Sequence, residues 1–123
     1  GSYSTGLALL EMNKNHPEKI LALEMGGNNP LIVTDISDLE AAAYLTIQSA
    51  FLSSGQRCTC ARRLILPEGR EADEFLKVLI HMTQSIQVGP YTSHPEPFMG
   101  PVISVEAADR LLNAQAMLGA QGG

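Results

Sequence analysis

Two side chains of this sequence have surroundings that favour chemistry over packing. Cys58 lies in residues 54–60 (Ser-Gly-Gln-Arg-Cys-Thr-Cys), a stretch led by glycine and flanked by arginine, outside any apolar periodic run. Glu24 follows the apolar run at 21–23 and comes just before a Gly-Gly turn at 26–27. Because a charged side chain is costly to bury, we expect Glu24 to face a cleft. A thiol and a carboxylate are a nucleophile and a candidate base.

The thiolate is the reactive form of cysteine, and a free thiol is only a few per cent ionised at neutral pH. Arg57, Arg62 and Arg63 are the cationic cluster that can favour the charged form at Cys58. The alternative is that Cys58 is a small buried hydrophobe, and that Glu24 is a surface or capping carboxylate. Cys60 lies two residues further on, and we interpret it as a structural residue rather than as a nucleophile.

The two segments that hold these residues are Leu-Glu-Met-Gly-Gly-Asn-Asn-Pro at 23–30 and Gly-Gln-Arg-Cys at 55–58. Together they resemble the two active-site signatures of the aldehyde dehydrogenase superfamily. The flanking residues are most similar to members that oxidise N-succinylglutamate 5-semialdehyde to N-succinylglutamate in bacterial arginine catabolism. The resemblance implies NAD(P)-dependent oxidation through a cysteine thioester, with Cys58 as nucleophile and Glu24 as the base that activates water. Another semialdehyde is the alternative substrate.

The resemblance also implies a cofactor site, for NAD with NADP not excluded. Residues 1–6 match the family's Gly-Ser-x-x-x-Gly segment, in which a helix N-terminus approaches the cofactor pyrophosphate. The implied contacts are Gly1, Ser2, Tyr3, Ser4, Thr5 and Gly6, together with Met25 and Gly26 near the nicotinamide. A Gly-Ser pair at a chain start is also typical of a cleaved tag.

Arg57 is the candidate contact for a substrate carboxylate, and its alternatives are a solvated loop arginine or an electrostatic helper for the thiolate. The three histidines have no metal-like or triad-like spacing with either cysteine. A Cys-x-Cys pair without a second cluster is a poor indication of metal binding. We therefore expect no metal site.

The order of the predicted elements places these residues in an α/β fold. We expect helices at 3–15, 38–53, 71–87 and 105–118, strands at 20–25, 30–34 and 63–66, and an irregular stretch at 89–101. Alternating strands and helices favour a mostly parallel sheet. The resemblance implies an aldehyde dehydrogenase-like, three-layer architecture, with 1–24 ending the dinucleotide-binding domain and 25–123 beginning the catalytic domain.

Composition limits the remaining functional classes. A net charge of −5 gives no support for nucleic-acid binding, and no apolar run approaches the roughly 20 residues that span a bilayer. We therefore expect a cytoplasmic protein that acts on a small-molecule aldehyde. Family members are far longer than 123 residues and commonly form homo-oligomers, so the resemblance implies a segment of such an enzyme. The alternative for the segment alone is a non-catalytic folding or assembly module.

Overall fold

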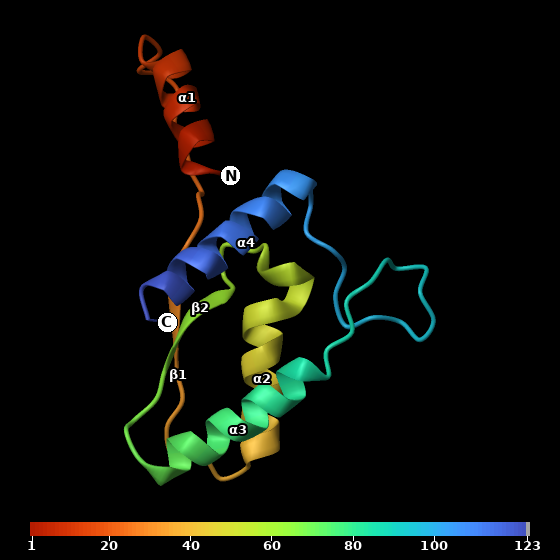
Figure 1. The fold of residues 1–123 in the computed structure, drawn as a ribbon. Helices are drawn as coiled ribbons and strands as arrows, with labels where there is room; N and C mark the ends of the chain where they lie inside the picture. The colour runs from red at the N-terminus through yellow and green to blue at the C-terminus, as the bar shows by residue number, and fades with distance from the viewer. Residues whose placement is uncertain (123) are drawn as a thin grey trace.

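A computed structural model of the chain describes residues 1–122. Figure 1 shows the N-terminal helix projecting from one end of a body in which the strands pack with the helices that follow them, while the C-terminal helix lies beside this body. In chain order the elements are α1 (Tyr3–Asn13), β1 (Asn29–Ile32), α2 (Leu39–Phe51), the 3₁₀ turn η1 (Leu52–Gly55), β2 (Ala61–Ile65), α3 (Arg70–Gln84) and α4 (Val105–Ala120).

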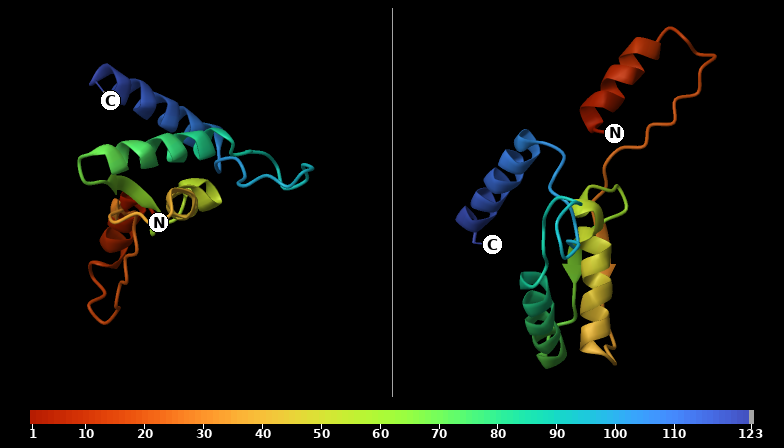
Figure 2. Two further views of the ribbon diagram at one scale, coloured as in Figure 1. Left: turned by 90° about the horizontal axis from the view of Figure 1, so that it is seen from below. Right: turned by 90° about the vertical axis from the view of Figure 1, so that its right-hand side faces the viewer.

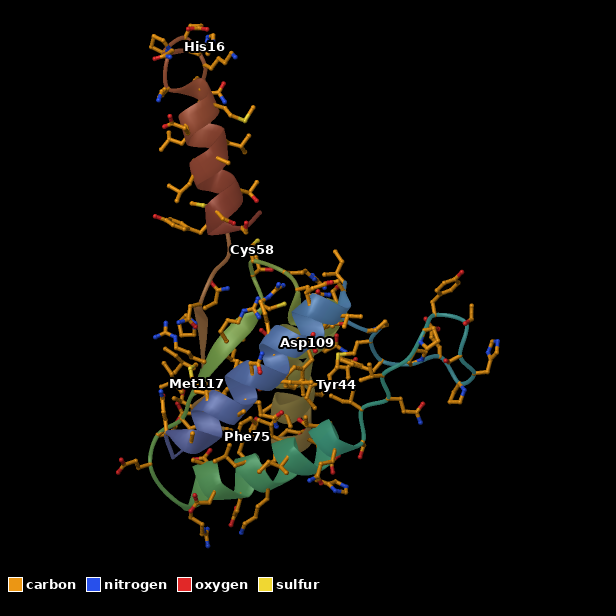
Figure 3. All side chains as sticks on the ribbon, turned by 45° about the horizontal axis from the view of Figure 1, so that its top comes forward. His16, Tyr44, Cys58, Phe75, Asp109 and Met117 are labelled. Atoms are coloured by element: carbon orange, nitrogen blue, oxygen red, sulfur yellow. The ribbon has the colours of Figure 1, made fainter. Side chains whose placement is uncertain are left out.

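The two strands form the parallel pair that the sequence predicts. Leu31 is paired with Leu64 and Ile32 with Ile65, and α2 makes the crossover between the strands. The fold class is thus α/β with a parallel sheet. The core lies where α2 meets α3 and β2, with the side chain of Phe75 fully buried, and Figure 3 shows Phe75 on α3 directed into this body.

Polar side chains cap the starts of α2 and α4. The side chain of Asp38 accepts a hydrogen bond from the Ala41 amide at 3.0 Å and so begins α2. Ser104 does the same for α4, from the Ala107 amide at 3.2 Å. A hydrogen bond from its own backbone amide, with further help from the Ser104 hydroxyl, lowers the pKa of Glu106 in the first turn of α4.

The expected strand at 20–25 is wrong. Residues 21–28 connect α1 to β1 without regular secondary structure, and Ile20 is 96% exposed (Figure 1). An apolar run becomes a strand only where another strand satisfies its backbone groups, and among the described residues this stretch has no such neighbour. The helix ends also differ from those expected. The helices α1 and α3 end earlier, at Asn13 and Gln84, α2 gives way to η1 after Phe51, and α4 continues to Ala120.

The described chain exposes much more surface than a compact monomer. Its accessible area is 9451 Å², whereas a folded protein of 13.2 kDa is expected to expose roughly 6,400 Å². Large apolar side chains are uncovered on α1 and α4, and both helices stand off from the body in Figure 2. Within the part that the structure describes, no helix has the length and apolarity needed to cross a membrane.

Candidate active site

The candidate nucleophile lies on a short loop between η1 and β2. We call residues 56–60 the cysteine loop. Cys58 is exposed at its tip (Figure 3), whereas Cys60 is only 4% exposed and its sulfur lies 3.8 Å from the carbonyl oxygen of Leu52. The two thiols therefore differ sharply in access, and the structural interpretation of Cys60 agrees with its burial.

A left-handed turn directs the chain from α2 into the cysteine loop. Ser53, Ser54 and Gly55 have φ angles of 58°, 56° and 66°. Serine pays an energetic cost in this region, about 1–3 kcal/mol for each residue, so surrounding contacts must hold the turn. The Ser54 hydroxyl donates to the Gly100 carbonyl at 2.5 Å. This bond ties the turn to the segment that leads into α4.

A second tie to that segment comes from the cysteine loop itself. The side-chain oxygen of Gln56 accepts a hydrogen bond from the Ile103 amide at 3.1 Å. The first residues of α4 thereby lie against the loop, with Ala107 buried at the contact. One side of the loop is thus held by the chain that precedes α4.

The opposite side of the cysteine loop rests on the start of β1. The side-chain amide of Asn29 donates to the Cys58 carbonyl at 2.6 Å and to the Cys60 carbonyl at 3.0 Å. Gly27 allows this approach, because a Cβ atom built on it would lie 2.7 Å from the Cys58 carbonyl oxygen. The Glu24 segment and the Cys58 segment, far apart in sequence, therefore meet.

A groove of about 550 Å³ opens beside the thiol. It brings Cys58 and Arg57 together with four of the predicted cofactor residues: Gly1, Ser2, Met25 and Gly26. The remaining lining comes from Gln56, Arg62 and Ile103. The groove thus joins the N-terminal end of α1 to the cysteine loop.

Glu24 lines a different hollow, of about 180 Å³, between α1 and the connector to β1. Thr5 and Gly6 also line it, and this hollow shares Gly1, Ser2 and Met25 with the groove beside Cys58. The carboxylate and the thiol are therefore placed in adjoining hollows rather than in one. Gly6 permits the close packing, since a Cβ atom there would lie 2.5 Å from the sulfur of Met25.

The first turn of α1 carries the remaining predicted cofactor residues, Tyr3 and Ser4. The hydroxyl of Ser2 accepts from the Thr5 amide at 3.1 Å and caps the helix. A helix N-terminus with its unpaired amides and partial positive charge suits an anion such as a pyrophosphate. The residues at this end of the groove therefore fit the cofactor pyrophosphate that the family resemblance implies.

The three arginines of the expected cationic cluster separate into two groups. Arg57 and Arg62 line the groove, and Arg62 also donates to the Arg57 carbonyl at 3.2 Å. Arg63 instead donates to the Asn28 carbonyl at 3.0 Å and braces the two strands. The Nε of Arg57 lies 3.3 Å from the Ser53 hydroxyl, a bond that leaves the terminal Nη fork of its guanidinium available to a carboxylate.

Sequence reasoning missed the residues that hold the loop: Asn29, Gln56, Ser54 and the backbone of Gly100 and Ile103. Their bonds join positions 29 to 47 residues apart, and no spacing rule reports such contacts. The pair of consecutive asparagines before Pro30 was the only available signal. Within residues 1–122 there is no group of three or more His, Cys, Asp or Glu side chains arranged to hold a metal ion.

Comparison with known proteins identifies relatives across the whole chain. Residues 1–123 match the aldehyde dehydrogenase family. The N-succinylglutamate 5-semialdehyde dehydrogenase of Pseudomonas fluorescens is 54% identical over 122 residues, which are 99% of this chain and 25% of that protein. The protein of the same name from Acinetobacter baylyi is 54% identical over 118 residues, 96% of this chain and 24% of that protein. The chain thus spans about a quarter of the length of these curated relatives.

Solved structures agree with the sequence comparison. The succinate-semialdehyde dehydrogenase of Burkholderia pseudomallei superposes with a TM-score of 0.87 at 34% identity, covering 99% of this chain and 25% of that one. The betaine aldehyde dehydrogenase of Staphylococcus aureus, solved in complex with NAD⁺, also gives 0.87, at 29% identity, over 99% of this chain and 24% of that one. The arrangement of elements described above is therefore shared with longer proteins of this kind.

Proposed function

This chain belongs to the aldehyde dehydrogenase family, and from that premise we propose that it carries the thiol and the carboxylate of an NAD(P)-dependent oxidation of an aldehyde to a carboxylate. The observation that carries the proposal is the groove in which Cys58 meets Gly1, Ser2, Met25 and Gly26. A nucleophile beside a helix N-terminus is the pairing that such chemistry needs, because the thiol must act next to a bound dinucleotide.

In the proposed reaction the Cys58 thiolate adds to the carbonyl carbon of the aldehyde and forms a hemithioacetal. The backbone amide of Cys58 donates to the developing oxyanion, and one such donor is worth about 3 kcal/mol. Loss of hydride from the same carbon then leaves a thioester on Cys58. When bound, a nicotinamide cofactor supplies the hydride acceptor for this step.

Glu24 serves the second half of the proposed reaction. Its carboxylate takes a proton from water, the hydroxide adds to the thioester carbon, and the Cys58 thiolate leaves as the carboxylate product forms. Glu24 is exposed in a hollow that adjoins the thiol's groove. That position gives water access to the base while the thiol faces the groove.

The proposed substrate is N-succinylglutamate 5-semialdehyde, which yields N-succinylglutamate. Two curated relatives that share 54% of this chain's residues carry that substrate in their names. Arg57, exposed at the groove beside Cys58, is the proposed contact for a substrate carboxylate. Another semialdehyde is the second candidate, since the Burkholderia structure named for succinate semialdehyde has the same arrangement of elements.

We further propose that residues 1–24 end the dinucleotide-binding domain and that residues 25–123 begin the catalytic domain, of which Gly123 lies outside the described residues. The separation of α1 from the body supports this division (Figure 2). The large exposed area favours a site that is complete only in a longer protein. We therefore expect this chain alone to be a weaker catalyst than a full-length enzyme that contains it.

A chimaeric enzyme tests the proposal. This chain replaces the matched 122-residue segment of the Pseudomonas fluorescens relative, and NADH formation is followed with N-succinylglutamate 5-semialdehyde. We expect turnover that Cys58→Ala abolishes and that Thr59→Ala, at the next exposed position, preserves. A folded chimaera that turns over equally well without Cys58 contradicts the proposal.

A further inference from the structure

We propose that Asn29 is a positioning residue for the candidate nucleophile, holding the cysteine loop through its side-chain amide. The inference rests on the function proposed above for Cys58. Its basis is the pair of hydrogen bonds from one Nδ2 atom to the Cys58 carbonyl at 2.6 Å and the Cys60 carbonyl at 3.0 Å. Both partners are backbone oxygens of the cysteine loop.

The chemistry of the contact fixes its direction. Carbonyl oxygens only accept hydrogen bonds, so the atom of Asn29 that faces both must be the NH₂ group, which has two hydrogens to donate. Each hydrogen satisfies one carbonyl. An aspartate has nearly the same shape but presents only acceptors when ionised, and a serine is shorter and has one donor. Asn29 is therefore matched to two carbonyls by donor number as well as by length.

Holding these two carbonyls fixes two peptide units of the cysteine loop, the one that joins Cys58 to Thr59 and the one that joins Cys60 to Ala61. A peptide unit is planar, so a carbonyl held in place also fixes the plane of the peptide that follows it. With both planes fixed, Cys58 is held against the start of β1 through the peptide on its C-terminal side. Its thiol is then directed to the groove that Arg57 and Arg62 line.

The neighbouring glycine belongs to the same device. A Cβ atom on Gly27 would lie 2.7 Å from the Cys58 carbonyl oxygen and 3.1 Å from the Asn29 amide nitrogen. The absence of a side chain at Gly27 thus makes room for both partners of the stronger bond. In the sequence Gly-Asn-Asn at 27–29, Gly27 leaves room for the cysteine loop and the Asn29 side chain holds it, with Asn28 between them.

The adjacent residue Asn28 supplies a matched control. Asn28 is exposed, and it contributes its backbone carbonyl to Arg63 rather than its side chain. Asn28→Ala makes the same chemical change as Asn29→Ala one position away. It removes a carboxamide from the same turn without removing a donor to the cysteine loop.

The first test uses the 123-residue chain and two alkylating reagents, neutral iodoacetamide and anionic iodoacetate, with each cysteine followed by mass spectrometry. Arg57 and Arg62, which line the groove with Cys58, should raise its rate with the anionic reagent relative to the neutral one, and one unit charge at about 4 Å in water accounts for roughly a fivefold change. We expect Asn29→Ala to lower the iodoacetate-to-iodoacetamide ratio at Cys58 by about that factor while Cys60 stays protected. Asn28→Ala should leave the ratio unchanged.

Two results of this test overturn the inference. An unchanged iodoacetate-to-iodoacetamide ratio at Cys58 in Asn29→Ala means that the Asn29 side chain does not position the thiol. Rapid labelling of Cys60, which is 4% exposed in the native chain, means that Asn29 maintains folding and does not position.

The second test uses the chimaeric enzyme. Misplacing a reacting group by about 1 Å costs on the order of 10²-fold in rate, so Asn29→Ala should lower kcat by roughly that factor with little change in KM. Asn29→Asp should lower kcat at least as much as Asn29→Ala, and Asn29→Ser should have a kcat between those of Asn29→Ala and the parent chimaera. An Asn29→Asp enzyme with native kcat refutes the inference while the proposed function stands. If the parent chimaera itself lacks Cys58-dependent turnover, the proposed function fails, and the alkylation ratio still decides whether Asn29 positions the thiol.

Discussion

Replacing Gly27 by alanine should destabilise the chain by pushing the cysteine loop away from β1. The new Cβ atom would lie 2.7 Å from the Cys58 carbonyl oxygen, well inside an ordinary van der Waals contact, and that oxygen belongs to backbone rather than to a flexible side chain. Overpacking of this kind costs about 1–3 kcal/mol. For a chain of this size we expect a fall in Tm of about 4 °C for each kcal/mol.

Gly26 provides the matched comparison, because a Cβ atom there meets nothing within 4 Å. Alanine at an unstrained glycine position restricts the unfolded chain and adds about 0.4–1 kcal/mol of stability. Urea unfolding followed by circular dichroism should therefore place Gly26→Ala at or above the native chain and Gly27→Ala below it. Equal stability of the two variants would show that the loop does not approach β1 as closely as described.

Three further predictions concern a helix cap, a titration and a substrate contact. Asp38→Ala should cost about 1 kcal/mol in urea unfolding, whereas Ser37→Ala, outside the cap, should cost little. The carboxyl of Glu106 should titrate by NMR below the ordinary glutamate range and move upward in Ser104→Ala; because its folded pKa is lowered, its contribution to stability is present at neutral pH and is lost as the pH falls through that pKa. In the chimaera, Arg57→Ala should raise KM for the dianionic substrate more than for a neutral aldehyde, and equal effects would exclude the carboxylate contact.

Local signals in the sequence were enough to predict most of the elements. An apolar helical face that follows Ser37 and Asp38, either of which can cap a helix, predicted α2, and Ser104 predicted the start of α4. A short apolar run with glycine before it gave β1, and a run that stops before Pro67 gave β2. These features depend on residues within a few positions of one another, so a single sequence contains them.

Features that depend on distant partners were not predictable in this way. The run at 20–25 has the composition of a strand, but no described strand pairs with it, so it remains a connector. The left-handed serines at 53 and 54 adopt a costly conformation that is held by contacts with other segments, such as the bond from Ser54 to the Gly100 carbonyl. Asn29 resembles any turn asparagine until the fold brings the carbonyls of Cys58 and Cys60 beside it.

The roles of Glu24 and Cys58 remain predictions that rest on their residue types and on the family to which the chain belongs. The structure adds where they lie, in adjoining hollows that share Gly1, Ser2 and Met25. Because the two residues line different hollows, the proposed roles assign Glu24 to a water molecule and Cys58 to the aldehyde. The proposed roles of Cys58 as nucleophile and Glu24 as base can therefore be tested directly.

That test is mass spectrometry of the chimaeric enzyme, quenched during turnover with N-succinylglutamate 5-semialdehyde and digested to peptides. We expect an acyl group on Cys58 and none on Cys60. We also expect Glu24→Gln to slow turnover by about 10²–10⁴-fold while the Cys58 acyl adduct accumulates. Turnover without any adduct on Cys58, or a Glu24→Gln enzyme that releases product at the native rate, would contradict the proposed roles of the two residues.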